Sequence, residues 1–220
     1  KKRFSVECKG FLFDLDGTLV DSLPAVERAW THWAERRGVD PQAVLDFIHG
    51  KQAITSLRHF MPGESEAEIQ REFQLVEAQD TDGVRALPGA IALLERLNAL
   101  GIPWAIVTSG SVPVAGARRQ AGGLPQPAVF ITAEQVKHGK PQPDAYLLGA
   151  ERLGLAPHEC VVVEDAPAGI LSGLAAGCQV IAVNAPADAP KLEQVDLRLD
   201  SLAQIAVDKT AQGAIVRRLA

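Results

Sequence analysis

Short apolar runs, bounded by polar or turn-forming residues, recur along the chain and predict buried strands. Between these runs, apolar residues return at helical spacing, as in residues 88–100 and 143–153. Continuous apolar strands that alternate with helices need cover on both faces of their sheet. The pattern therefore predicts an α/β fold, a Rossmann-like three-layer core whose parallel sheet is built from residues 10–15, 103–108, 128–133, 160–164 and 179–183.

The interval between the first two predicted strands is too long for a single connecting helix. Helical patterns cover residues 23–37, 41–48 and 52–60, and an acidic stretch follows at residues 64–82. We expect residues 20–86 to form a helical cap inserted after the first strand, with residues 1–19 and 87–220 forming the core. A longer helical layer on the sheet is the alternative. The insertion is favoured because it begins directly after the strand richest in reactive side chains.

Composition and charge narrow the class of protein. Of 220 residues, 47% are hydrophobic and 22% are charged, which is typical of a soluble globular chain rather than a disordered one. No apolar run is long enough to span a bilayer, so we expect no membrane partner. A net charge of -5 argues against nucleic acid as a partner. Three cysteines in a chain of this size favour free thiols and a cytoplasmic location.

Two carboxylates follow the first predicted strand. Asp14 and Asp16 lie two positions apart, so strand periodicity places both side chains on one side of the sheet's carboxyl edge. Carboxylates so close repel each other unless a cation or a proton lies between them. A strand that simply ends in a polar turn is the alternative interpretation of this pair.

Other predicted strands and loops end in polar side chains at the same edge. Thr108 and Ser109 follow the second strand, Glu164 and Asp165 follow a later one, and Lys140 lies in a proline-stiffened loop. Each of these side chains, taken alone, has a purely structural explanation. Hydroxyls and carboxylates often cap helices, and a lysine is usually a solvated surface charge. Together they offer carboxylates, hydroxyls and an ammonium group, which suit a hard cation and a phosphate.

The segments that carry these side chains resemble a known family. FLFDLDGTLVDS, VTSG, GKPQPD and VVVEDAPAG resemble, in this order, the four motifs of haloacid dehalogenase-like hydrolases of the phosphatase branch. The matches extend over residues 10–177. The expected helical insertion after the first motif resembles the helical cap of the subfamily that includes β-phosphoglucomutase and many sugar phosphatases. IHGKQAITSL resembles 2-deoxyglucose-6-phosphatase relatives, and the segment 86–110 resembles bacterial sugar and hexitol phosphatases.

The resemblance implies a role for each residue. Asp14 would be the nucleophile that becomes an aspartyl phosphate, and Asp16 the general acid and then the base. An Asp at position 16 is typical of phosphatases rather than dehalogenases. Mg²⁺ would be held by Asp14, the backbone carbonyl of Asp16 and Asp165, with Glu164 bound directly or through water. The phosphoryl oxygens would be held by Thr108, Ser109 and Lys140.

The substrate implied by the resemblance is a small phosphorylated sugar or polyol, a hexose or hexitol phosphate. We expect the protein to act as a monomer. His49, Lys51 and Gln52 flank Gly50 in the expected cap and would contact the substrate, although polar loop residues on the surface are an equal alternative. A hexose-phosphate mutase of the β-phosphoglucomutase type is the alternative function. A phosphoacceptor signalling module is a more distant one, and the large insertion and the GKPQPD loop fit it badly.

Overall fold

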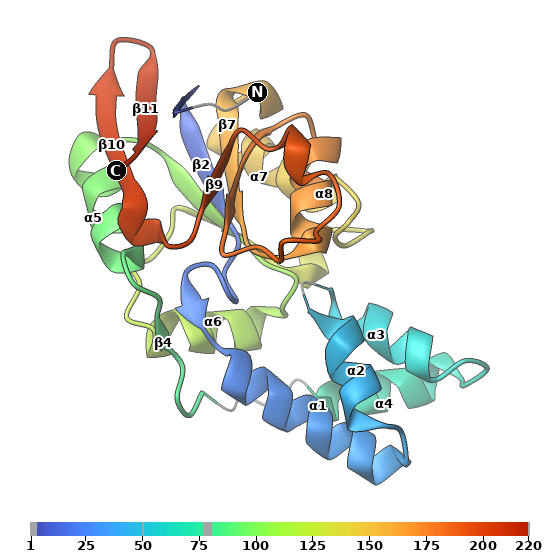
Figure 1. The fold of residues 1–220 in the computed structure, drawn as a ribbon. Coiled ribbons are helices and arrows are strands. Elements are labelled where there is room, and N and C mark those ends of the chain that lie inside the picture. Colours follow the sequence, from blue (N-terminus) through green and yellow to red (C-terminus); the bar gives the residue numbers. More distant parts are fainter. Residues whose placement is uncertain (1–3, 50, 77–80, 220) are drawn as a thin grey trace.

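A six-stranded sheet forms the centre of the protein (Figure 1), and every adjacent pair of its strands runs parallel. The computed structural model describes residues 4–49, 51–76 and 81–219. The α/β prediction is confirmed. The five predicted strands correspond to the first five strands of this sheet in chain order, and three of them are two or three residues shorter than predicted. In sheet order the strands are β6 (Val129–Ile131), β5 (Trp104–Val107), β2 (Gly10–Phe13), β7 (Cys160–Glu164), β8 (Gln179–Val183) and β9 (Leu197–Leu199).

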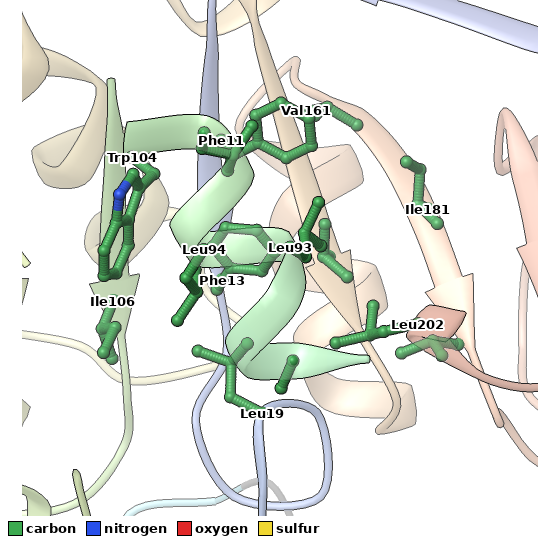
Figure 2. Packing of buried hydrophobic residues seen from close by; sticks show 14 of the residues in the cluster. Phe11, Phe13, Leu19, Leu93, Leu94, Trp104, Ile106, Val161, Ile181 and Leu202 are labelled. Carbon is green, nitrogen blue, oxygen red and sulfur yellow. The ribbon is translucent and has the colours of Figure 1, made fainter. Parts of the chain in front are cut away.

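Both faces of the sheet are covered, because successive residues of a strand point to opposite sides. Phe11 and Phe13 pack on one face with helices α5 (Ala90–Leu100) and α6 (Val112–Ala121), as Figure 2 shows for Phe11, Phe13, Leu93 and Leu94. Leu12 packs on the other face with α7 (Asp144–Leu153) and α8 (Pro167–Ala175). The three cysteines are buried free thiols.

A second, antiparallel sheet was not predicted. Strand β11 (Gly213–Arg218) lies between β1 (Ser5–Cys8) and β10 (Ile205–Thr210), so the two ends of the chain pair with each other. This sheet lies next to α5, where Nε of Arg96 donates to the carbonyl of Val207 at 3.3 Å. Its inward residues Val207, Ala214 and Val216 join the core on that side.

Four helices form a separate lobe (Figure 1) between the short paired strands β3 (Val20–Asp21) and β4 (Arg85–Ala86). Gly50 and residues 77–80 of the acidic stretch lie outside the described residues. Trp30 and Trp33 belong to a hydrophobic cluster made only of residues from this lobe. Every helix in the described ranges is too short or too polar to cross a membrane. The helices are α1 (Leu23–Arg37), α2 (Pro41–Ile48), α3 (Ala53–Phe60) and α4 (Glu66–Val76).

The strand order creates a crevice beside β2. From β2 the chain continues to β5 and β6 on one side and to β7, β8 and β9 on the other. Such a topological switch point leaves a crevice at the carboxyl ends of the strands, where ligands of open α/β sheets bind. The helical lobe is inserted directly after β2, so it lies at this end of the sheet.

Candidate active site

A buried lysine joins the carboxyl ends of three strands. Nζ of Lys140 lies 2.9 Å from Oδ1 of Asp14 after β2, 3.0 Å from the carbonyl of Val107 in β5, and 2.7 Å from Oε1 of Glu164 in β7. Burial alone lowers the pKa of Lys140, but the two carboxylates outweigh burial and raise it. The lysine is therefore a permanent cation next to Asp14.

Three carboxylates lie together at this point. One oxygen atom each of Asp14, Glu164 and Asp165 falls within 4.8 Å of the others. Burial first, and the Asp14 carboxylate second, raise the pKa values of Glu164 and Asp165, since three close carboxylates cannot all stay ionised without more positive charge. Oε2 of Glu164 is buried and has no hydrogen-bond partner among the described residues. An all-oxygen set with an unpartnered atom fits a hard divalent cation such as Mg²⁺.

The turn after Asp16 holds these carboxylates in place. Gly17 has φ of +84°, and a β-carbon there would collide with the carboxylate of Asp165. The hydroxyl of Thr18 lies 3.0 Å from Oδ1 of Asp165 and 3.3 Å from Oδ2 of Asp14. Gly17 therefore lets the ends of β2 and β7 approach closely. The hydroxyl of Thr18 bridges the carboxylates of Asp14 and Asp165.

The hydroxyl residues after β5 lie at the same edge. The backbone N–H of Thr108 donates to the carbonyl of Ile131 at 2.9 Å, which continues the sheet by one residue. Oγ1 of Thr108 accepts a hydrogen bond from the backbone N–H of Gly110 at 3.2 Å, which fixes a tight turn. Thr108, Ser109 and Gly110 line the same cavity as Asp14 and Asp165.

That cavity, of about 680 Å³, lies between the sheet edge and the helical lobe. From the lobe it is lined by Trp30, His49 and Lys51, among others. Nζ of Lys51 donates to the carbonyl of Phe47 at 2.9 Å and lies 3.5 Å from the centre of the Phe47 ring. Partial burial lowers the pKa of Lys51. The structure thus places two of the three predicted cap residues on the cavity.

The third predicted cap residue lies elsewhere. Gln52 packs against Gly139, where a β-carbon would press on the Gln52 side chain. It lines a second cavity, of about 620 Å³, on the Lys140 loop rather than the one that contains Asp14. Gln52 therefore contacts the loop that carries Lys140.

The Asp16 carboxylate is held outside the acidic cluster. Its Oδ1 atom accepts a hydrogen bond from Oγ of Ser22 at 2.5 Å and lies 3.2 Å from Nη1 of Arg118. Arg118 was not predicted as a site residue. The available signal was its spacing, since it follows the buried Val114 and Ala115 by four and three positions and so shares their face of α6.

Tyr146 is a second site residue that was not predicted from the sequence. Its hydroxyl donates to Oε1 of Glu164 at 2.5 Å, and Nζ of Lys140 lies 4.9 Å from the centre of its ring. Burial is the main reason that the pKa of Tyr146 is raised, so the hydroxyl remains a donor. Tyr146 and Lys140 together hold Glu164 by one oxygen atom.

The chain is similar in sequence to known phosphatases and to one family of hydrolases. A family model described as haloacid dehalogenase-like hydrolase matches residues 8–177. The chain is 71% identical over 214 residues to hexitol phosphatase A of Escherichia coli (strain K12), covering 96% of this chain and 99% of that protein. It is 35% identical over 193 residues to glycerol-1-phosphate phosphohydrolase 2 of Saccharomyces cerevisiae, with coverage of 83% and 77%.

A solved structure shares the fold. The crystal structure of a hydrolase from Pseudomonas syringae superposes with a TM-score of 0.76 at 25% sequence identity, covering 89% of this chain and 94% of that one. The family model spans most of the chain, and the four motifs meet at one edge of the sheet. This chain therefore belongs to the haloacid dehalogenase-like hydrolases.

Proposed function

We propose that the protein is a Mg²⁺-dependent phosphatase that hydrolyses small phosphorylated sugars or polyols, in particular hexose or hexitol phosphates. The observation that carries this proposal is the contact of the buried Lys140 with both Asp14 and Glu164 at the edge of the cavity. This contact places the ammonium group of Lys140 next to the Asp14 carboxylate, which is the nucleophile in the proposed reaction. The 71% identity to a protein named hexitol phosphatase A supports the class of substrate.

In the first step an oxygen atom of Asp14 attacks phosphorus, and the bond from phosphorus to the alcohol oxygen breaks. Asp16 donates a proton to the departing alcohol, and an aspartyl phosphate remains. A carboxylate that attacks a phosphate dianion meets like-charge repulsion, so nearby positive charge must offset it. Lys140 offers that charge, and Thr108 and Ser109 would hold phosphoryl oxygens.

In the second step water attacks the phosphorus atom of the aspartyl phosphate. Asp16, now a carboxylate, removes a proton from the water, and the bond between phosphorus and Asp14 breaks. Inorganic phosphate leaves and the Asp14 carboxylate is restored. Two covalent steps replace one very slow hydrolysis, which is the general advantage of nucleophilic catalysis.

The metal would be held by Asp14, the backbone carbonyl of Asp16 and Asp165, with Glu164 bound directly or through water. When bound, Mg²⁺ would supply positive charge that offsets the negative charge on nucleophile and phosphate. The unpartnered Oε2 of Glu164 and the close approach of the three carboxylates support this assignment.

We assign the helical lobe, residues 20–86, as a cap on the core of residues 1–19 and 87–220. His49 and Lys51 line the cavity from the cap, so they are suited to contact the alcohol part of the substrate. Gln52 would act indirectly, because it packs against Gly139 in the loop of Lys140. All of these residues come from a single chain, which fits a monomeric enzyme.

A phosphate-release screen tests the function. Hexose, pentose, hexitol and glycerol phosphates are incubated with the enzyme in Mg²⁺ and in chelator. Steady release from a hexose or hexitol phosphate in Mg²⁺, without a bisphosphate activator, is the expected result and excludes a dedicated mutase. Asp14→Asn should show no release while keeping the native fold, as judged by circular dichroism. Isomerisation of hexose phosphates without release, or full activity of Asp14→Asn, would contradict the proposal.

A further inference from the structure

The two partners of the Asp16 carboxylate bind the same oxygen atom. The hydroxyl of Ser22 and the guanidinium of Arg118 both contact Oδ1, at 2.5 Å and 3.2 Å. The hydrogen bonds and ion pairs found among the described residues do not engage Oδ2. The Asp16 side chain is 29% exposed and lines the main cavity, so Oδ2 is the oxygen left for a bound substrate.

Arg118 is not an ordinary surface charge. Its side chain is only 14% exposed, and its Nε atom is buried without a hydrogen-bond partner in the described part of the chain. Burying a guanidinium costs free energy unless an acceptor compensates it, and Oδ1 of Asp16 is that acceptor, which leaves Oδ2 able to carry a proton. The adjacent Arg119 instead donates to the carbonyl of Leu124 at 2.7 Å, near the end of α6.

We propose that Arg118 is a positioning residue that, together with Ser22, fixes Oδ1 of Asp16 so that Oδ2 faces the oxygen of the leaving alcohol. The inference rests on the proposed function, because it takes Asp16 as the acid of the first step. Proton transfer requires a heavy-atom distance of about 2.6–3.2 Å, which a freely rotating carboxylate would often lose. Ser22 lies at the start of α1, where the chain enters the helical lobe, and Arg118 lies on α6 of the core. The Asp16 carboxylate is therefore held by one residue from each part of the protein.

Arg118 also lines the cavity, so direct contact with the substrate is the competing explanation. The two roles differ in their dependence on the leaving group. A residue that orients the acid matters most when the departing oxygen is strongly basic, as in an alkyl phosphate. It matters little for 4-nitrophenyl phosphate, whose leaving group needs almost no protonation. A residue that binds the phosphoryl group would affect both substrates equally.

The test compares kcat/KM for 4-nitrophenyl phosphate with kcat/KM for the alkyl phosphate that performs best in the screen. This parameter covers the steps up to release of the alcohol, and so excludes hydrolysis of the aspartyl phosphate. Arg118→Met should lower the alkyl value up to about 100-fold, the cost of misplacing a catalytic group by roughly 1 Å. The aryl value should fall less than about threefold, because general acid assistance contributes little there. Arg119→Met, on the same helix with the same change of charge, should match the native enzyme.

The double variant Asp16→Asn/Arg118→Met decides whether Arg118 acts through Asp16. If it does, adding Arg118→Met to Asp16→Asn should lower the alkyl kcat/KM by no more than about twofold, since residues that act as a unit are not additive. Ser22→Ala, which removes the other partner of Oδ1, should reproduce the selective loss and serves if Arg118→Met folds poorly.

Two outcomes overturn the inference, and they can be told apart from failure of the proposed function. Equal losses with both substrates, or losses that multiply in the double variant, would reject the positioning role. The proposed function would still stand if Asp16→Asn showed a leaving-group-selective loss. An Asp16→Asn enzyme with native kcat/KM on the alkyl phosphate would overturn the inference together with the acid role of Asp16, while the phosphatase function itself fails only if the native enzyme releases no phosphate in the screen.

Discussion

The ammonium nitrogen of Lys140 lies 2.7 Å from Oε1 of Glu164, and both side chains are almost fully buried. Breaking such a pair by removing one partner costs about 3–5 kcal/mol, because the other charge stays buried without compensation. A Lys140→Met variant should therefore lose both stability and activity. In the variant Lys140→Met/Glu164→Gln the charge of Glu164 is also gone while Asp14 still lacks its cation, so stability should return only in part and activity not at all.

Urea unfolding in the absence of Mg²⁺ measures these differences. Lys9→Met is a suitable control, since Lys9 forms an ion pair with Glu159 at 2.8 Å but is half exposed. Loss of that pair should change the free energy of unfolding by about 0–1 kcal/mol. A Lys140→Met protein as stable as the native one would show that the buried pair does not stabilise the site.

Gly17 is expected to control metal binding through its lack of a side chain. A β-carbon at Gly17 would collide with Asp165, whereas one at Gly63 would meet no atom within 4 Å. Both glycines have positive φ, +84° and +80°, so alanine at either costs about 1–2 kcal/mol of backbone strain. Only Gly17→Ala should also weaken Mg²⁺ binding, by about tenfold or more. Isothermal titration of both variants checks this, and equal Mg²⁺ affinities would contradict it.

Acid should weaken the helical lobe through Glu72. Its carboxylate accepts hydrogen bonds from Arg36 at 2.6 Å and from the indole of Trp33 at 2.9 Å. The bond from Arg36 lowers the pKa of Glu72 despite burial. A lowered folded-state pKa gives stability that is complete above the ordinary value of about 4.3 and disappears as pH falls through the folded-state value. Glu72→Gln should thus cost about 1–3 kcal/mol at pH 7, and its deficit should shrink at acidic pH.

Unfolding by urea between pH 7 and pH 3 measures this deficit. Glu66→Gln is the matched control, because Glu66 lies on the same helix and pairs with Arg58 at 3.3 Å on the surface. Its effect should stay below about 1 kcal/mol. A Glu72→Gln deficit that stayed constant down to pH 3 would show that the carboxylate contributes no pH-dependent stability.

Removal of Mg²⁺ should lower the melting temperature. A ligand at 100 times its Kd stabilises the folded state by about 2.7 kcal/mol, and binding here would also relieve repulsion among three carboxylates. Asp165→Asn should remove most of this gain, whereas Asp188→Asn, at an exposed position, should keep it. Melting curves in Mg²⁺ and in chelator provide the measurement. Equal stabilisation of native protein and Asp165→Asn would place the metal elsewhere.

Five strands of the central sheet were predictable because burial on both faces leaves continuous apolar runs, whereas the edge strand β9, which alternates buried and exposed residues, was not predicted. β7, for example, is buried at every residue. The antiparallel sheet was not predictable in the same way. Its strands alternate buried with exposed residues, and Ser5 pairs with Arg217 at the opposite end of the chain. A local pattern carries no information about such a distant partner.

The candidate site likewise contains residues that were predictable from the sequence and residues that were not. Asp14 and Lys140 are 126 positions apart, yet the ends of parallel strands share one edge, so their proximity followed from the predicted topology. Arg118 and Tyr146 lie on helices, where an arginine is usually assigned to solvent and a tyrosine to the core. Their contacts with Asp16 and Glu164 depend on the tilt and rotation of α6 and α7, which no short motif specifies.

The pairing of β3 with β4 has a consequence for how such enzymes diversify. Val20 pairs with Ala86, and the N–H of Leu87 donates to the carbonyl of Leu19 at 2.9 Å, so the chain leaves and re-enters the core at adjacent points. The entropic cost of closing the chain between two adjacent points grows only slowly with the length of the segment, by about 0.6 kcal/mol for each doubling. This adjacency favours exchange of the four-helix segment as a unit. Replacing it with the corresponding segment of a relative should leave the positions of Asp14 and Lys140 unchanged and, if the lobe contacts the substrate as we propose, should change the substrate preference.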